Sequence, residues 1–483
     1  MKSRRSNCFA LIALSIGLMA SGQLVAQNTE VSKQGHHHYK VIDMGTLGGP
    51  AAYKSVNAPG YQILANSGEV ANAADTPMPD PFAPNCYYPP DCHVTHAVRW
   101  SNGSLTDLGA LPGDGNGSAS GAINAQGWIV GQSEDGEIDP ISGLPEIHAT
   151  LWHDGRIADL GTFGGHWSIG LTLNDAGDVV GFATNSTPDP YALFPPAGTQ
   201  TRAFRWRRGE LSDLGTLGGD DAQALSVNRS GQIVGSSYTD TIPNDTTGIP
   251  TVHPFLWESG RMVDLGTLGG TYAGPGSCNF GASCSSPVPQ YEGSLLINNR
   301  SQVIGTSNLA GDQTFHPFLW EKGKMRDLGT LGGDNGVAIW LTDNGEVIGQ
   351  ADVPGSQAYH GFRWKDGAIT DVGTLEGDQC SRALMANSKG QIVGGTLGIC
   401  QVETTRAFLW ENDGPIVDLN SLILGNTGAD LYEADNINER GEIVASGLPA
   451  RCNDRFSCGH VYLLIPCDAN HADVEGCVYR TVE

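Results

Sequence analysis

The sequence predicts an all-β fold, a closed β-propeller of four-stranded blades. A heptapeptide of the type Asp-Leu-Gly-Thr-Leu-Gly-Gly returns along the whole chain, and successive copies start 44 to 64 residues apart, the period of a propeller blade or a solenoid unit. Glycine supplies 66 of the 483 residues, and short alternating apolar runs lie between turn signals. No stretch keeps the apolar spacing of three and four residues that an amphipathic helix needs.

Eight copies of the heptapeptide can be counted, which predicts eight blades. They begin at Asp43, Asp107, Asp159, Asp213, Asp264, Asp327, Asp371 and Asp418. The last copy reads Asp-Leu-Asn-Ser-Leu-Ile-Leu and has lost its glycines. Seven blades is therefore the alternative.

Each copy belongs to a larger unit with room for four strands. In one such unit, a first apolar run opens at Arg202 and ends at Trp206, and a second run leads into Asp213. A third run ends at Asn228, which begins an Asn-x-x-Gly turn, and a fourth ends on the Ile-Val-Gly of Gly235. Four short antiparallel strands in a unit of this length are typical of a propeller blade.

The repeating unit resembles that of the HAF-type extracellular repeat family, whose name reflects a His-Ala-Phe triplet. The triplet is met here as His96-Ala-Val, His148-Ala-Thr and Arg406-Ala-Phe. The resemblance covers essentially the whole chain after its first segment. It implies an exported bacterial repeat protein, and no biochemical activity that can be transferred residue by residue.

Residues 1–26 have the pattern of a secretory signal peptide. Three basic residues precede an apolar run from Phe9 to Met19, and cleavage is expected near Ala26. The run is short for a membrane span, and a retained anchor is the alternative. Because this segment carries three positive charges and no acid, its removal takes the formal net charge from −25 to −28. We expect a secreted protein, extracellular or periplasmic, that binds neither nucleic acid nor anionic membranes.

The rest of the chain divides into a polar segment (27–38), the repeat region (39–466) and a tail closed by a disulfide (467–483). The first repeat starts in mid-unit, because the run from Tyr39 to Asp43 has no leading strand of its own. The run from His460 to Ile465 supplies one at the other end. Pairing of these two terminal strands would close the ring and hide two sheet edges.

Ten cysteines follow the signal peptide and form five pairs of near neighbours, which predicts local disulfides in an oxidising compartment. The pairs are Cys86 with Cys92, Cys278 with Cys284, Cys380 with Cys400, Cys452 with Cys458, and Cys467 with Cys477. A zinc site is not expected, because three of these pairs have five intervening residues rather than a CxxC-like spacing.

A basic residue opens each first strand, and an aspartate follows at a nearly constant distance. The pairs are His96 and Asp107, His148 and Asp159, Arg202 and Asp213, His253 and Asp264, His316 and Asp327, His360 and Asp371, Arg406 and Asp418, and, through ring closure, His460 and Asp43. Across a short hairpin this spacing allows a charge-assisted hydrogen bond. We interpret the pairs as structural, since every unit has one. The alternative is a ring of imidazoles around a metal or anion site at the axis.

Long Pro-rich insertions are expected on one face of the propeller, together with the glycine loops. They occupy residues 75–93, 133–147, 184–201, 236–252 and 271–293. Insertions confined to one side of a repeat fold commonly build a binding surface. Aromatic residues in them are candidates for stacking on sugars or peptide side chains, namely Phe82, Tyr87, Tyr88, Tyr191 and Phe194. The alternative is that they pin their own loops, as the strand-ending tryptophans are expected to pack between blades.

Familiar catalytic motifs are missing: the sequence has no GxSxG elbow, no HExxH and no P-loop, and it predicts no cofactor. Asp220-Asp221, Asp334-Asn335 and Asp378 offer oxygen ligands for calcium, but solvated loop tips are the simpler interpretation because their spacing fits no calcium motif. We therefore expect a secreted, non-enzymatic scaffold that binds an extracellular or envelope glycan or protein. The alternative is a propeller hydrolase or lyase that acts on polysaccharide through carboxylates paired in space.

Overall fold

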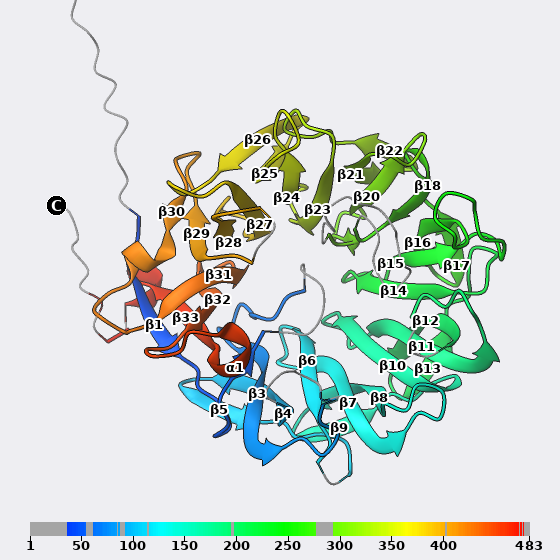
Figure 1. Cartoon of the computed structure of the whole chain (residues 1–483), viewed down its shortest axis with the longest axis horizontal. Helices are drawn as coiled ribbons and strands as arrows, with labels where there is room; N and C mark the ends of the chain where they lie inside the picture. The colour runs from blue at the N-terminus through cyan, green and yellow to red at the C-terminus, as the bar shows by residue number, and fades with distance from the viewer. Residues whose placement is uncertain are drawn as a thin grey trace, which may run out of the picture. The chain divides into compact units, whose positions relative to one another are not determined.

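Antiparallel strands that follow one another along the chain form four-stranded units, and these lie side by side around a common axis (Figure 1). The computed structural model describes residues 36–54, 61–84, 86, 92–113, 115–194, 198–276, 293–400, 403–472, 474, 475 and 477. In each unit the first strand lies nearest the axis and the last lies at the rim. This arrangement is a β-propeller, and we call each four-stranded unit a blade.

From the axis outwards, the first complete blade along the chain consists of β2 (Ala52–Tyr53), β3 (Val70–Pro79), β4 (His93–Ser101) and β5 (Ser104–Asp107). The next two consist of β6 (Ser118–Ile123), β7 (Ile129–Ile138), β8 (Pro145–His153) and β9 (Arg156–Asp159), and of β10 (Gly164–Leu173), β11 (Val179–Pro188), β12 (Thr199–Arg207) and β13 (Glu210–Asp213). They are followed by β14 (Ala222–Val227), β15 (Ile233–Tyr238), β16 (Val252–Glu258) and β17 (Arg261–Asp264).

In the next blade β18 (Gly269–Gly274) and β19 (Leu296–Ile297) both pair with β20 (Val303–Leu309), which is followed by β21 (Phe315–Glu321) and β22 (Lys324–Asp327). The two blades after it consist of β23 (Gly336–Leu341), β24 (Val347–Asp352), β25 (Tyr359–Lys365) and β26 (Ala368–Gly373), and of β27 (Cys380–Ala386), β28 (Ile392–Leu397), β29 (Arg406–Trp410) and β30 (Val417–Asp418). The remaining blade consists of β31 (Asp430–Ile437), β32 (Ile443–Leu448), β33 (His460–Pro466) and β1 (Tyr39–Asp43). The helical turns are η2 (Leu419–Leu422), α1 (Arg455–Cys458) and η3 (Ala469–His471).

Strand β1 completes the sheet that the end of the repeat region begins. It pairs antiparallel with β33 over its whole length, from Tyr39 opposite Pro466 to Asp43 opposite Tyr462. Tyr39 is only 1% exposed and lies in one buried cluster with Leu431 of β31. The two ends of the repeat region therefore share one sheet, held by strand pairing and by a buried side chain.

A phenylalanine on the third strand and a glycine on the second fit together in most blades. The fully buried phenylalanines on third strands are Phe204, Phe255, Phe318, Phe362 and Phe408. Phe255 lies opposite Gly235, and a Cβ added at Gly235 would lie 2.7 Å from the Phe255 ring and 1.9 Å from the carbonyl oxygen of Gln223. The first strand has a register shift at this level, which brings that carbonyl close. The Phe of the HAF-like triplet and the Gly of Ile-Val-Gly therefore form one packing unit.

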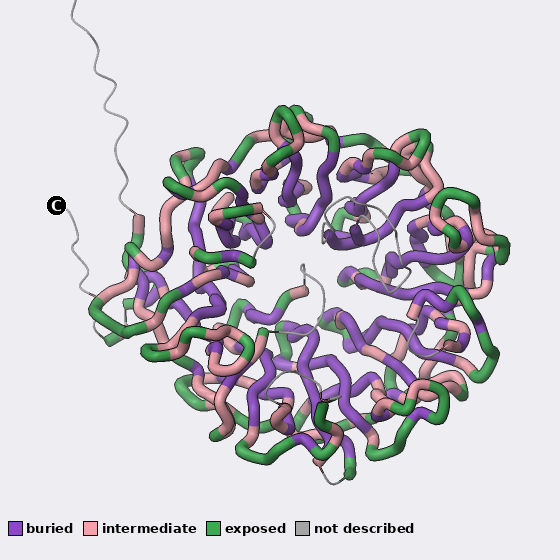
Figure 2. Tube along the Cα trace, in the orientation of Figure 1, coloured by how far each residue is buried: buried purple, intermediate pink, exposed green. Residues whose placement is uncertain are grey.

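Apolar clusters fill the space between neighbouring blades. Buried residues follow the strands, while exposed residues gather in the turns and loops (Figure 2). Trp152 of β8 shares a buried cluster with Ala71 of β3, and Trp257 of β16 shares one with Val180 of β11. The guanidinium of Arg205 on β12 lies over the Trp257 ring at 5.0 Å. These tryptophans pack between blades, as the sequence predicts.

Four of the five predicted disulfides are confirmed. They join Cys86 to Cys92, Cys380 to Cys400, Cys452 to Cys458, and Cys467 to Cys477. The remaining predicted pair, Cys278 and Cys284, lies outside the described residues. Among the residues that the structure describes, no helix has the length and apolar character needed to span a membrane.

Candidate functional site

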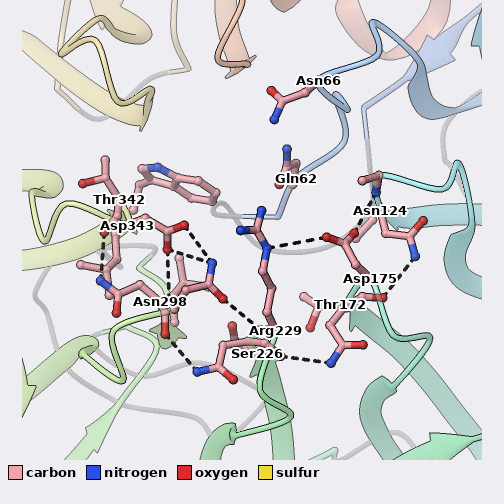
Figure 3. A pocket seen from close by; sticks show the side chains of 18 of the residues that line it. Gln62, Asn66, Asn124, Thr172, Asp175, Ser226, Arg229, Asn298, Thr342 and Asp343 are labelled. Atoms are coloured by element: carbon pink, nitrogen blue, oxygen red, sulfur yellow. Dashed lines mark hydrogen bonds and ion pairs between the residues drawn. The ribbon is translucent and has the colours of Figure 1, made fainter.

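A polar pocket of about 320 Å³ opens at the axis, on the face of the Asn-x-x-Gly turns (Figure 3). Its walls are the ends of the innermost strands and the turns that follow them. The residues labelled in Figure 3 are Gln62, Asn66, Asn124, Thr172, Asp175, Ser226, Arg229, Asn298, Thr342 and Asp343. The sequence predicts binding on the opposite face, so sequence reasoning misses this pocket. Its only sequence signal is the repeated Asn-x-x-Gly turn.

The first asparagine of each turn ties its blade to the next one. Its Nδ2 donates to a backbone carbonyl of the neighbouring turn at 3.0–3.1 Å, from Asn124 to Asn174, Asn174 to Asn228, Asn228 to Asn298, Asn298 to Thr342, Asn387 to Asn438 and Asn438 to Ala65. The series is interrupted where Thr342 and Ala65 stand in place of asparagine. The same asparagines accept from backbone N–H groups of their own turn, as Asn228 does from Gln232. The repeated turn is therefore an inter-blade fastening around the pocket.

The second residue of each turn determines the charge at the mouth of the pocket. Asp175 and Asp343 accept hydrogen bonds from the backbone N–H of the preceding blade, at 3.1 and 3.0 Å, and Glu439 does the same. Arg229 lies 3.7 Å from Asp175 and offsets part of this negative charge. Because the three carboxylates stand at equivalent turn positions and complete backbone contacts, their first role is structural.

The strand-opening histidines lie on third strands, away from the axis. Each has Nδ1 2.8 to 3.1 Å from its aspartate in the pairs His96–Asp107, His148–Asp159, His253–Asp264, His316–Asp327, His360–Asp371 and His460–Asp43. Arg202 Nε similarly donates to Asp213 at 2.9 Å. Since two strands separate these side chains from the axis, they form no axial ring of imidazoles.

The aspartate of each pair also closes the glycine loop that follows it. Asp264 Oδ1 accepts from the N–H of Gly266 at 2.7 Å, and Thr267 Oγ1 donates to the carbonyl of Gly270 at 2.9 Å. Burial acts to raise the pKa of Asp264, but the hydrogen bonds from His253 and Gly266 outweigh it and leave that pKa below its ordinary value. The polar residues of the heptapeptide thus hold a loop whose glycine, at φ +75°, has a left-handed conformation.

Arg406 departs from this pattern, and its predicted partner is wrong. Asp418 caps the helical turn η2 by accepting from the N–H of Asn420 at 2.9 Å. Arg406 instead lies 2.7 Å from Asp378 and donates to the carbonyl of Glu376 at 2.8 Å. The copy at Asp418 has no glycines, so the chain forms a helical turn there in place of the left-handed loop.

Two of the acidic residues considered for calcium, Asp221 and Asp378, are not solvated loop tips, so that interpretation is wrong for them. Asp221 is fully buried and accepts from the N–H groups of Leu193 and Thr201. Asp378 pairs with Arg406. Loops of neighbouring segments fold over these carboxylates, which the sequence spacing does not reveal.

Apolar side chains project from the loops that join second and third strands on neighbouring blades. In five of these loops an aspartate accepts a hydrogen bond from the N–H two residues later, at 2.7–3.2 Å, and that later residue is apolar. The pairs are Asp454 and Phe456, Asp80 and Phe82, Asp139 and Ile141, Asp189 and Tyr191, and Asp240 and Ile242. We call Phe456, Phe82, Ile141, Tyr191 and Ile242 the apolar row. Four of them are exposed, with exposed fractions up to 58% for Ile141 and 74% for Ile242, and Phe82 is half-buried.

The predicted recognition aromatics divide into three groups. Phe82 and Tyr191 belong to the apolar row. Phe194 lies 5.5 Å from the Trp167 ring and 5.3 Å from the Phe182 ring, so it fixes its own loop. Tyr87 and Tyr88 lie outside the described residues. Sequence reasoning misses the aliphatic members of the row, although the Asp-Pro-x triplets at three of its positions were an available signal.

Buried carboxylates lie near these loops. Glu134 is 2% exposed and accepts from the N–H of Gly117 at 2.5 Å. Burial, and to a smaller extent the charge of Asp80, raise the pKa of Glu134 to about 7. Burial also raises the pKa of Asp221 to about 7, with a contribution from Asp189. Both carboxylates are therefore partly protonated at neutral pH in the folded protein.

We expect Glu134→Gln to weaken the pH dependence of stability. The folded-state pKa of Glu134, about 7, lies above its ordinary value of 4.5, so this group costs wild-type stability progressively as pH rises from 4.5 through 7. Glutamine keeps an acceptor for Gly117 and cannot ionise. In urea unfolding the variant should gain about 1–3 kcal/mol over wild-type between pH 5 and pH 8. Asp221 is unchanged in both proteins, so parallel pH profiles would contradict the prediction.

Comparisons with known proteins come from structures alone, because no protein-family model and no curated protein matches the chain. The chain is similar to acylaminoacyl peptidase from Pyrococcus horikoshii, at 12% identity over 83% of this chain and 58% of that chain, with a TM-score of 0.42. Oligogalacturonate lyase from Vibrio parahaemolyticus is 9% identical to this chain. The match covers 89% of this chain and 94% of that chain, with a TM-score of 0.45. The β-propeller domain of the trilobed protease from Pyrococcus furiosus is 10% identical to this chain. The match covers 79% of this chain and 98% of that chain, with a TM-score of 0.39. The propeller fold of this chain is established by its own strand order.

Proposed function

We propose that the protein is an exported, non-enzymatic binding module whose apolar row recognises a partner protein outside the cell. The observation that carries this proposal is the row itself, in which five neighbouring loops present one apolar side chain each from the same kind of turn. A turn held by its own aspartate loses little freedom on binding, which favours affinity. Aliphatic members such as Ile141 and Ile242 suit a protein surface better than a sugar, which prefers aromatic rings.

We further infer that the blades number eight and close into a ring. Contacts between the two ends of the chain support this. Strand β1 pairs with β33, and His460 Nδ1 lies 2.9 Å from Asp43. Trp100 of β4 shares a buried cluster with Val444 of β32. In a closed ring the apolar row runs without interruption across the junction of the chain ends.

Export is part of the proposal. The N-terminal signal pattern, the four local disulfides and the strong negative charge all suit an oxidising compartment outside the cytoplasm. The resemblance to HAF-type extracellular repeats implies the same compartment. No cofactor is required for binding of this kind.

A polysaccharide hydrolase or lyase is the second candidate, and the axial pocket is what favours it. Asp175, Asp343 and Glu439 lie around that pocket and could in principle serve as paired carboxylates. Against this role, each accepts a backbone hydrogen bond from the neighbouring blade. Binding through the apolar row and catalysis in the pocket use opposite faces, so one experiment separates them.

The test compares the mature protein with Ile141→Asp/Ile242→Asp on arrays of envelope proteins and of polysaccharides, with mass spectrometry of any product. The matched control is Ile399→Asp, since Ile399 is 60% exposed but lies outside the apolar row. We expect a protein ligand that the double variant binds at least about 100-fold more weakly, because burial of each isoleucine is worth about 1.5–3 kcal/mol. A ligand bound equally by all three proteins would overturn the proposal. Glycan binding lost in the double variant would change the ligand class, and released oligosaccharides would establish the enzyme.

A further inference from the structure

One blade contains a cluster of metal-ligating side chains that is not found elsewhere among the residues that the structure describes. Asp135 of β7 and Glu146 and His148 of β8 have ligand atoms that all lie within 4.8 Å of one another. Glu146 and His148 are two residues apart on one strand, so their side chains leave the same face of the sheet. The three side chains are 12–18% exposed, which shields them from solvent while leaving a path of entry. This cluster lies on the face of the insertion loops, outside the axial pocket.

The ring of His148 is oriented for coordination by its second nitrogen. Its Nδ1 lies 3.0 Å from Asp159, in the pairing that recurs in other blades. A carboxylate at Nδ1 keeps the proton there and leaves the lone pair on Nε2. That nitrogen points to the cluster, with Asp135 Oδ2 at 3.6 Å. Ligand atoms around a tetrahedral zinc ion lie roughly 3.3 Å apart, given metal–ligand distances of about 2.0–2.1 Å.

The two acids beside His148 have no counterpart in the other blades. In the β14–β17 blade, His253 forms the same pair with Asp264, but the flanking positions hold Thr239 and Thr251, which pair with each other. In the β10–β13 blade the corresponding residues are a neutral hydrogen-bonded pair, Asn185 and Gln200. Two carboxylates on facing strands repel each other, and a bound cation relieves that repulsion. The residues at these two positions vary from blade to blade, and of these three blades only the one with His148 places a carboxylate at both.

A second histidine comes from the neighbouring blade. Trp167 of β10 forms a parallel bridge with Ile147 of β8, which places the preceding residue, His166, against the cluster. His166 Nδ1 lies 2.5 Å from Glu146 Oε1. The segment is fixed in turn by the Trp167 indole, which donates to Asp139 at 3.0 Å. His166 can therefore orient Glu146.

We propose that Asp135, Glu146 and His148, with His166 orienting Glu146, bind one divalent transition-metal ion of the zinc class. Mixed imidazole and carboxylate ligands suit zinc and its first-row neighbours, whereas calcium and magnesium take oxygen ligands. The ion would join β7 to β8 where the two strands lead into their loop. This proposal is independent of the proposed binding function.

The experiment is zinc titration of the full mature protein, with affinity measured against a chromogenic chelator. His36, His37 and His38 form a second possible zinc ligand set in the sequence, so all proteins carry alanine at these three positions. We expect one zinc site in this background, unchanged in His253→Gln and weakened at least about 100-fold in His148→Gln and in Asp135→Asn/Glu146→Gln. The control His253→Gln breaks the same kind of pair in a blade that lacks the acids.

Two further readouts use the same proteins. Zinc should raise the thermal midpoint of the background protein and of His253→Gln, but not that of the double variant. X-ray absorption is measured on the zinc-loaded background protein, so it does not depend on whether the variants fold. The spectrum should show a shell of nitrogen and oxygen atoms about 2.0 Å from the zinc ion, with imidazole scattering. Absence of zinc binding, equal binding by the double variant, or a shell without imidazole would each overturn the proposal.

Discussion

Gly235→Ala is expected to lower the free energy of unfolding by at least about 4 kcal/mol, at the upper end of single-substitution effects. A Cβ at this position would lie 1.9 Å from the carbonyl oxygen of Gln223 and 2.7 Å from the Phe255 ring. The first obstacle is backbone held in the sheet, and the second is a fully buried ring, so neither can move aside cheaply. Denaturant unfolding of the purified variant, followed by intrinsic fluorescence, measures the loss.

Gly398→Ala is the matched control. A Cβ there would meet only Asp378 Oδ1 at 3.8 Å, and the backbone needs no positive φ, so its stability should stay within about 0.5 kcal/mol of wild-type. Combining Gly235→Ala with Phe255→Leu should restore only part of the loss, because the Gln223 carbonyl remains. A Gly235→Ala protein within about 1 kcal/mol of wild-type would show that the inner strand can shift outwards.

The blade that contains strands from both ends of the repeat region shows what such a shift requires. There Ala445 takes the place of the glycine, opposite Ala434 on one side and Tyr462 on the other. Strand β31 has two register irregularities in that blade, where β14 has one opposite β15. A methyl group at this position therefore accompanies a more distorted inner strand, which a single substitution in another blade cannot supply.

A chain that starts at Met44, without β1, is expected to lose more than about 5 kcal/mol of stability and to aggregate. It lacks the five ladder residues Tyr39–Asp43 and the buried Tyr39 ring, and the Asp43 carboxylate no longer meets His460. It also leaves β33 as an exposed edge strand, a template for pairing with other chains. Soluble yield, light scattering and the thermal midpoint report the effect.

The control is a chain that starts at His36, which keeps β1 and should behave as the full mature protein. A synthetic peptide of residues 36–50 should restore the thermal midpoint of the shortened chain in trans. The same peptide with proline at Ile42 should not. Met44 N–H donates to the carbonyl of Val461, so the N–H two residues earlier also faces β33, and proline removes it. A shortened chain that remains monomeric and equally stable would contradict the proposed ring closure.

Much of the fold could be predicted because its determinants are local and repeated. Strand alternation, glycine turns and the heptapeptide act over a few residues, and the repeats report the same arrangement independently. The residues paired across one hairpin, such as His96 and Asp107, follow from hairpin spacing alone. The exception at Arg406 shows the limit of this reasoning, since its partner Asp378 precedes it on a loop that no hairpin rule connects to it.

The sequence by itself determined the all-β class, the strand pattern, the disulfide pairs that the structure describes, and the position of four insertions between the second and third strands of their blades. Tertiary structure alone decided what meets across blades. It brings Asn438 of the last turn to Ala65 of the first, collects the apolar row from five loops, and places His166 beside Glu146. The reason is physical: hydrogen bonds along a hairpin are set by short sequence separations, whereas contacts between blades depend on how whole sheets pack around the axis. Residues at equivalent positions of the repeat form a site only in the blade where sheet packing places different side chains next to them.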